Sequence, residues 1–444
     1  MDLSNLALAD PWQAADAVAV WQGTPNLATY AIVADGFCHH GQPAAAEEWI
    51  LGRKEKKESE WKRLLFNNNN NSTGTTTSSQ SQATIVSSTY MGLLTAWANY
   101  QPSTGYGAQR AEALVRSLMK LHGLSSMTTS GTNSSSTNVM SAPTSRLLWV
   151  KCWTIVLEAW CKRVPHCSLS HAERILHAME QPDSTIQPNL LTYTSYIVGL
   201  AQSRRVDAAR TAQRILDTTI GSESADLVAY TAVMNAWAKA TSRVERRQAA
   251  TATMRLLERM EGPSRDEEDE TDNGEQQQQQ RFALNPIVYA TAIAAIGNTW
   301  VDDDPNDGKD ATYFADLAAS LVPRMRSQGV TPVTETYNTL LHAYGNLSPS
   351  LFAQRAWGVL CHQVPHPTVR TWSAVLRASR GDAPTAHKVL EAMETAYYGG
   401  TEAAGTGKET GTSPQPNTVC YTTVRRRGVQ HPSDMRRSFV SLKP

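Results

Sequence analysis

The sequence has little of what defines several large classes of protein. Its six cysteines are scattered over 444 residues, which is too few for a disulfide framework. No run of about eighteen consecutive apolar residues occurs, so the sequence predicts no membrane-spanning helix. Net charge is also lacking, because 41 Lys and Arg residues balance 41 Asp and Glu residues. Taken over the whole chain, this neutrality argues against nucleic acid as a partner.

The N-terminal region lacks basic residues. The first of them is Arg53, whereas Asp2, Asp10 and Asp16 all precede it. Transit peptides for mitochondria or plastids are rich in Arg and poor in acids, and secretory signals begin with a basic segment. Neither kind of targeting segment is therefore visible in this sequence.

What the sequence does contain is a recurring motif. Pro-Asn, followed four residues after the Pro by Thr or Cys and then by Tyr, occupies residues 25–30, 188–193 and 416–421. Weaker copies of the frame end at Tyr90, Trp153, Tyr230, Tyr289, Tyr337 and Trp372. The shortest spacing, from Tyr337 to Trp372, is 35 residues. Self-similarity at such a period is the signature of a repeat array.

The residues after each aromatic anchor predict a helix. Apolar side chains fall three, four and seven positions later, as with Leu93, Leu94 and Trp97 after Tyr90. This spacing marks one face of an α-helix, and the alternation typical of strands is missing. Ala-rich second helices are predicted over 43–51, 206–216, 245–260 and 384–393. Such hairpins bury their apolar faces only by stacking, so the predicted fold class is an all-α solenoid of stacked helical hairpins with disordered insertions.

Low-complexity segments interrupt the repeats. Residues 67–82, 125–145, 265–280 and 399–413 are too polar to offset the cost of ordering, and we expect them to form disordered loops. The predicted organisation begins with a partial repeat at 1–24 that has a second helix only, followed by repeats 1 and 2 at 25–124 with an insertion at 67–82. A linker at 125–145 leads to repeats 3 to 8 at 146–398, which contain an acidic and Gln-rich insertion at 262–281. A second linker at 399–415 precedes a partial repeat with a basic tail at 416–444.

The chain opens in the middle of this pattern. Residues 10–21 resemble the second helix of a hairpin, with Asp10 as the N-cap and Pro11 at the first helical position. We therefore expect this sequence to be a shortened version of a longer chain.

The repeat resembles that of the pentatricopeptide repeat (PPR) proteins, and residues 25–48 are similar to the family consensus along their whole length. The rival tetratricopeptide frame, Trp-x2-Leu-Gly-x2-Tyr, is not found. The resemblance implies binding of single-stranded RNA, with one base per repeat read by two or three side chains. It also implies RNA-processing proteins as further partners and a role in transcript processing, stability or translation in the mitochondrion or plastid.

The family pattern assigns site residues by position. One selecting residue follows the aromatic anchor directly, another lies four positions before the next anchor, and an aliphatic wedge lies two positions before the anchor. The implied RNA-binding residues are Thr154, Asn189, Thr194, Asp226, Thr231, Asn285, Asn338, Ser373 and Asn417. The implied base wedges are Leu191, Val228 and Val419. The third to fifth repeats are then expected to read A-G-A, because an amide suits adenine while a carboxylate only accepts and suits guanine.

Other repeats depart from this pattern. Ala31 and Ala290 offer no hydrogen-bonding group, and Lys151, Glu335 and Arg370 replace the aliphatic wedge. A second interpretation applies to the polar residues that do fit. Thr or Ser in the first turn of a helix, and Asn before it, are also ordinary capping choices.

Patterns that would indicate chemistry are incomplete. A zinc-like group comprises Cys161, His166, Cys167 and His171, but it lacks the tight pairs of structural zinc sites. Residues 302–313 lack the Glu at position twelve of a calcium loop. His171-Ala-Glu173 is not followed by the Pro-Cys-x-x-Cys of a deaminase. We therefore expect no enzymatic activity, metal, cofactor, small-molecule substrate or membrane contact. The alternative to RNA binding is an α-solenoid scaffold for protein–protein interaction that binds no RNA.

The zero net charge has a local origin. Residues 266–275 contain seven acids and no base, and residues 302–310 contain five acids and one Lys. Outside these two segments, basic residues exceed acidic ones by eleven. The neutrality of the whole chain therefore does not argue against RNA as a partner. The basic excess outside the two acidic segments predicts only a weak electrostatic attraction between the protein and RNA.

Overall fold

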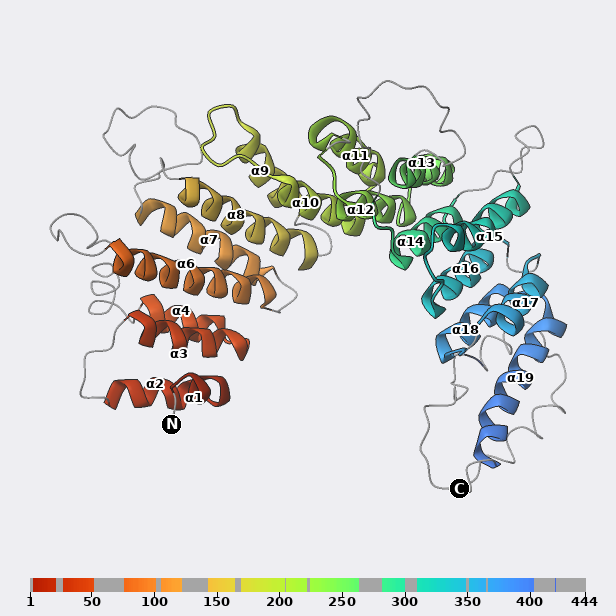
Figure 1. Cartoon of the computed structure of the whole chain (residues 1–444), viewed down its shortest axis with the longest axis horizontal. Helices are drawn as coiled ribbons and strands as arrows, with labels where there is room; N and C mark the ends of the chain where they lie inside the picture. Colours follow the sequence, from red (N-terminus) through yellow and green to blue (C-terminus); the bar gives the residue numbers. More distant parts are fainter. Residues whose placement is uncertain are drawn as a thin grey trace, which may run out of the picture. The chain divides into compact units, whose positions relative to one another are not determined.

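The computed structural model describes residues 3–20, 27–51, 76–100, 105–121, 143–163, 169–203, 205–221, 224–262, 282–299, 310–348, 351–364, 366–402 and 420. The regular elements in these ranges are all helices, which confirms the predicted all-α class (Figure 1). The chain forms two compact units, Met1–Ser203 and Arg204–Pro444.

The first unit is a stack of hairpins. Its helices are α1 (Leu3–Ala9), α2 (Pro11–Val20), α3 (Leu27–His39), α4 (Pro43–Leu51), α6 (Thr76–Asn99), α7 (Tyr106–Leu121), α8 (Pro143–Arg163), α9 (Leu169–Glu180) and α10 (Leu190–Ser203). The first helices α1, α3, α6, α8 and α10 pack on one another in chain order. Each second helix packs on its own partner and on the next first helix, so the hairpins share one continuous core.

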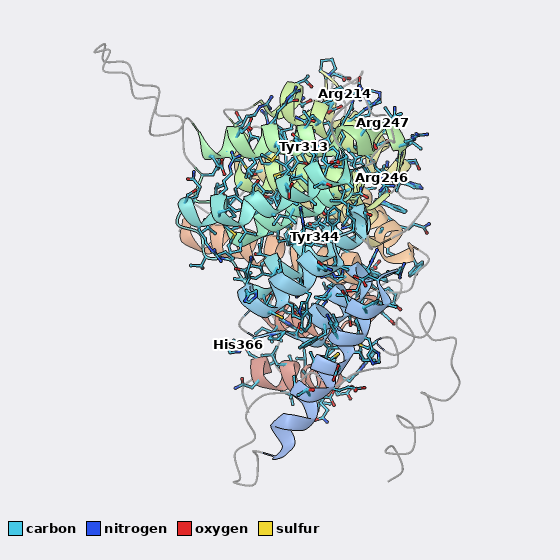
Figure 2. All side chains as sticks on the ribbon, turned by 90° about the vertical axis from the view of Figure 1, so that its right-hand side faces the viewer. Arg214, Arg246, Arg247, Tyr313, Tyr344 and His366 are labelled. Carbon is cyan, nitrogen blue, oxygen red and sulfur yellow. The ribbon has the colours of Figure 1, made fainter. Side chains whose placement is uncertain are left out.

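The second unit repeats this arrangement. Its helices are α11 (Ala208–Arg214), which continues into a π-helical turn (Ile215–Ile220), α12 (Leu227–Ala238), α13 (Arg243–Glu261), α14 (Pro286–Gly297), α15 (Ala311–Ser327), α16 (Thr334–Leu347), α17 (Ala353–Gln363), α18 (Val369–Ala378) and α19 (Ala383–Glu402). Here the first helices α12, α14, α16 and α18 pack successively. Figure 2 labels Arg214 of α11 and Arg247 of α13 among the side chains drawn as sticks.

The predicted apolar stripes form the core. Leu93, Leu94 and Trp97 are buried in α6, and the corresponding residues of every later first helix through α16 are buried too. The anchors Tyr90 and Tyr289 are likewise buried. Sequence spacing alone therefore located the inner face of these helices.

Small residues set the distance between neighbouring first helices. A Cβ atom on Gly297 of α14 would lie 2.5 Å from Cβ and 2.6 Å from Cα of Ala343 on α16. Gly36 of α3 stands equally close to the backbone of Ala7 on α1, where a Cβ atom would lie 2.5 Å from the Ala7 carbonyl oxygen. The first helices therefore pack backbone to backbone at these points, and no larger side chain fits without a shift.

The prediction that residues 1–24 hold only a second helix is wrong. Helix α1 precedes α2 and packs against both α2 and α3. It has only seven residues, too few to be stable alone, and it is held by burial of Ala7 against Gly36. The expected start of α2 is confirmed, because Asp10 Oδ1 accepts the backbone N–H groups of Trp12 at 3.0 Å and Gln13 at 3.2 Å.

The helices also extend into segments that we expected to be disordered. Helix α6 begins at Thr76, α8 begins at Pro143 and α19 continues to Glu402. Once a packed helix exists, each added residue gains a backbone hydrogen bond, so polar flanking residues extend it. The remaining parts of these low-complexity segments lie outside the described residues. Within the described ranges, no helix is long and apolar enough to cross a membrane.

Candidate nucleic-acid interface

Three of the predicted RNA-binding residues are helix N-caps. Asp226 precedes α12, and its Oδ1 accepts the backbone N–H of Ala229 at 2.8 Å. Asn285 precedes α14, and its Oδ1 accepts the N–H groups of Ile287 and Val288, both at 3.1 Å. Asn189 precedes α10 in the same way. The capping interpretation of these positions is therefore confirmed, and any contact with a base must use the atoms that capping leaves over.

Capping decides which polar atom remains available. The Asn285 Oδ1 already accepts two hydrogen bonds, and the Asn189 Oδ1 lies 2.9 Å from both the backbone N and the Oγ1 of Thr192. Among the described residues, the Nδ2 groups of both Asn side chains make no hydrogen bond. The Asp226 Oδ2 is likewise uncommitted. The two Asn residues thus present donors, while Asp226 presents an acceptor.

The threonines that follow the aromatic anchors use their hydroxyl groups internally. The Oγ1 atoms of Thr194 and Thr231 donate to the carbonyl oxygens four residues earlier, at 2.8 and 2.6 Å. Thr194 is buried, whereas Thr231 is half-buried. Base contact at these positions remains a prediction, and it requires the hydroxyl oxygen to act as an acceptor while it donates to the helix.

The third-repeat pair is brought together by a relay. Thr154 on α8 is 3% exposed, and its Oγ1 lies 2.8 Å from both the Val150 carbonyl oxygen and the Oγ1 of Thr192 on α10. The Thr192 Oγ1 in turn lies 2.9 Å from the Asn189 Oδ1. Thr154 and Asn189 are therefore linked through Thr192. A base would reach Thr154 only if this contact opened, so that part of the readout stays a prediction.

The remaining pairs are less complete. Thr194 and Asp226 belong to different units. Asn338 on α16 is buried, and its Oδ1 has no hydrogen-bond partner among the described residues. Ser373 on α18 is half-buried, with its Oγ 3.8 Å from the Cys420 Sγ. The predicted residues Asn417 and Val419 lie outside the described residues.

Exposed aliphatic side chains accompany the three caps. Leu191 is 59% exposed and Val228 is 61% exposed, each two residues after its cap. Ile287 holds the same place after Asn285 and is 64% exposed. Our sequence reasoning missed Ile287, although its position two residues before Tyr289 was signal enough to find it. The cap and the exposed aliphatic side chain therefore form a unit that occurs at the start of α10, α12 and α14.

The zinc-like group has an ordinary packing role where it can be seen. Cys161 is buried against Gly199, and the ring of His171 stacks on Trp160 with centroids 4.2 Å apart. His166 and Cys167 lie outside the described residues. Within the described part of the chain, no group of three or more His, Cys, Asp or Glu side chains is placed to hold a metal ion.

Stacked helical hairpins whose first helices pack in chain order define the protein as an α-solenoid. One stretch of the chain matches the model of a known family. The Pentatricopeptide repeat domain model matches residues 315–347, which run from within α15 to the end of α16. This stretch is therefore similar to a pentatricopeptide repeat. No curated protein sequence matches the chain.

Solved structures of pentatricopeptide repeat proteins are similar to the chain. The crystal structure of the pentatricopeptide repeat protein PPR10 from maize shows 15% identity and a TM-score of 0.35 over 95% of this chain and 60% of that chain. The structure of PPR10 in complex with an 18-nt psaJ RNA element shows 17% identity and a TM-score of 0.30 over 95% of this chain and 55% of that one. The present chain thus spans 60% or less of the length of these proteins.

Proposed function

We propose that this protein binds single-stranded RNA along its first helices. The observation that carries the proposal is the cap-and-aliphatic unit at the start of α10, α12 and α14. An unstacked base presents a polar edge and an apolar face, and each unit offers an uncommitted polar atom beside an exposed aliphatic side chain. A single exposed aliphatic residue needs no explanation. Three exposed aliphatic residues that each lie two residues after a helix cap do need an explanation.

The uncommitted atoms support an ordered base preference. The Nδ2 groups of Asn189 and Asn285 suit the ring-nitrogen acceptors of adenine. The Asp226 Oδ2 suits the N–H donors of guanine. The A-G-A reading of the third to fifth repeats is therefore part of the proposal, with the caps rather than the buried threonines as its main determinants.

The cellular role that we propose follows the family. Occupancy of a single-stranded segment in a mitochondrial or plastid transcript would protect it, guide its processing or aid its translation. The mechanism is steric occupancy together with recruitment of RNA-processing proteins, and it involves no catalysis.

Filter binding to a pool of random single-stranded RNA tests the proposal. Binding at micromolar protein that weakens with salt is expected, and its absence would favour the protein–protein scaffold instead. Truncation of Leu191, Val228 and Ile287 to Ala should weaken binding at least about tenfold, because each buried CH2 contributes about 0.8 kcal/mol.

A matched control uses exposed valines elsewhere. Val206, just before α11, is 71% exposed, and Val244, in the first turn of the second helix α13, is 52% exposed. Their joint truncation to Ala should leave RNA affinity unchanged. An equal loss of affinity in both sets of variants would mean that the cap-and-aliphatic units have no special role.

A further inference from the structure

Helix α18 departs from the cap-and-aliphatic pattern. The position that is aliphatic in α10, α12 and α14 is occupied in α18 by Arg370, whose side chain is exposed. Arg370 makes no hydrogen bond or ion pair with any described residue. The cap before α18 is also committed, because Thr368 and Thr371 form a reciprocal capping box. This hairpin therefore offers a base neither an apolar wedge nor an uncommitted cap atom.

A second arginine lies on the same face of α18. Arg377 is exposed and follows Arg370 by seven residues, which corresponds to two helical turns, or about 10 Å along the axis. The Arg377 Nη2 donates to the Asn346 Oδ1 at 2.8 Å, and this contact fixes the guanidinium beside α16. No described carboxylate lies within ion-pairing distance of either arginine. The two positive charges are thus uncompensated by any local ion pair.

His342 on α16 lies within electrostatic reach of both arginines. Burial, and then the charges of Arg377 and Arg370, lower the pKa of the half-buried His342 imidazole below its ordinary value of 6.5. The imidazole is therefore mostly neutral at neutral pH. Acids on the adjoining segments do not offset the arginines: Glu335 makes no ion pair with a described residue, and Asp382 accepts hydrogen bonds from Thr385.

We propose that Arg370 and Arg377 bind the phosphodiester backbone of the RNA across the α16–α18 face, in place of a base. The proposal rests on the proposed RNA-binding function and adds a phosphate site to it. Guanidinium groups match phosphate geometry through paired N–H donors, and an unpaired exposed guanidinium is ready to make such contacts. Within the second unit, the RNA strand would then be read at α12 and α14 and held by its charge at α18.

The salt dependence of RNA affinity tests this site. The double variant R370Q/R377Q should lower the slope of log affinity against log salt by about 0.7 for each phosphate that the protein no longer neutralises. Base preference at the third to fifth repeats should not change. The matched control is R214Q/R255Q, which removes the same charge from exposed, unpaired arginines on the second helices α11 and α13 (Figure 2 shows Arg214). The control should keep the slope of the wild-type protein.

Replacing a charged phosphodiester of the RNA by a neutral methylphosphonate tests whether phosphate is the ligand of these arginines. A single methylphosphonate scanned along the bound RNA should weaken wild-type binding at one or two linkages, and R370Q/R377Q should be insensitive at those same linkages. An unchanged salt slope in R370Q/R377Q, with wild-type binding intact, overturns the phosphate site and leaves the proposed function standing. A change in base preference without a change in slope also overturns it. If the wild-type protein does not bind RNA, both proposals fall.

Discussion

Substitution of Gly297 by Ala should open the seam between α14 and α16. The new Cβ would lie 2.5 Å from Cβ and 2.6 Å from Cα of Ala343. Carbon atoms in contact normally lie about 3.5–4.0 Å apart, so the helices must separate by about 1 Å. Overpacking of this kind typically costs about 1–3 kcal/mol. The obstacle is backbone and Cβ rather than a flexible side-chain end, so relaxation by rotamer change is not available.

A control variant isolates the packing cost from helix propensity. Gly358 lies within α17, and a Cβ atom there would meet nothing within 4 Å. Gly358→Ala should therefore stabilise the protein by up to about 1 kcal/mol through helix propensity alone. The difference between the two variants in the free energy of unfolding, about 1–3 kcal/mol, is the cost of overpacking at Gly297.

Urea denaturation, combined with hydrogen exchange resolved on α14 and α16, measures this difference. Adding Ala343→Gly to Gly297→Ala should recover at least about 1 kcal/mol relative to the sum of the single changes, because the two residues are in contact. If Gly297→Ala proves as stabilising as Gly358→Ala, the close packing of α14 on α16 is refuted.

Two further predictions concern ionisable groups of the second unit. Glu261→Ala should lower the free energy of unfolding by about 3 kcal/mol, because the Tyr289 hydroxyl (2.8 Å) and the Arg324 Nε (2.9 Å) both donate to this buried carboxylate. Urea denaturation measures this loss of stability. As a control, Glu258→Ala removes an exposed carboxylate and should stay within about 0.5 kcal/mol of wild type. The lowered pKa of His342 means that the unfolded chain binds more protons below pH 6.5, so stability should fall as pH drops through this value. His342→Gln should reduce that fall when urea midpoints are compared at about pH 8 and about pH 5.5, and an identical pH profile would contradict the burial of a neutral imidazole.

The inner face of the solenoid was predictable because it depends on local spacing. Residues such as Val233, Met234 and Trp237 follow the anchor Tyr230 at helical intervals, and all are buried in α12. The caps were predictable for the same reason, since Asp226 and Asn285 act within three residues of themselves. Local rules determine both features.

Features that depend on tertiary contacts were not predictable. Glu245 on α13 is buried, and its Oε1 accepts the backbone N–H of Arg210 on α11 at 3.0 Å, a cap supplied by another hairpin. Burial raises the pKa of this carboxyl group. The burial of Thr154 is of the same kind, because it depends on the contact with Thr192 across two first helices. A residue that looks available from its place in the repeat can therefore be closed off by the neighbouring helix.

The base preference of Asp226→Asn tests the central claim, that helix caps read bases, most directly. Asn caps a helix about as well as Asp, so Oδ1 keeps its bond to the Ala229 N–H while the uncommitted acceptor becomes a donor. The control is Asp310→Asn, the cap of the second helix α15, whose Oδ1 accepts the Tyr313 N–H at 2.8 Å. Selection from a random RNA pool should show a shift from guanine towards adenine at one position for Asp226→Asn and no shift for Asp310→Asn. A uniform loss across sequences, or the same result for both variants, would contradict the claim.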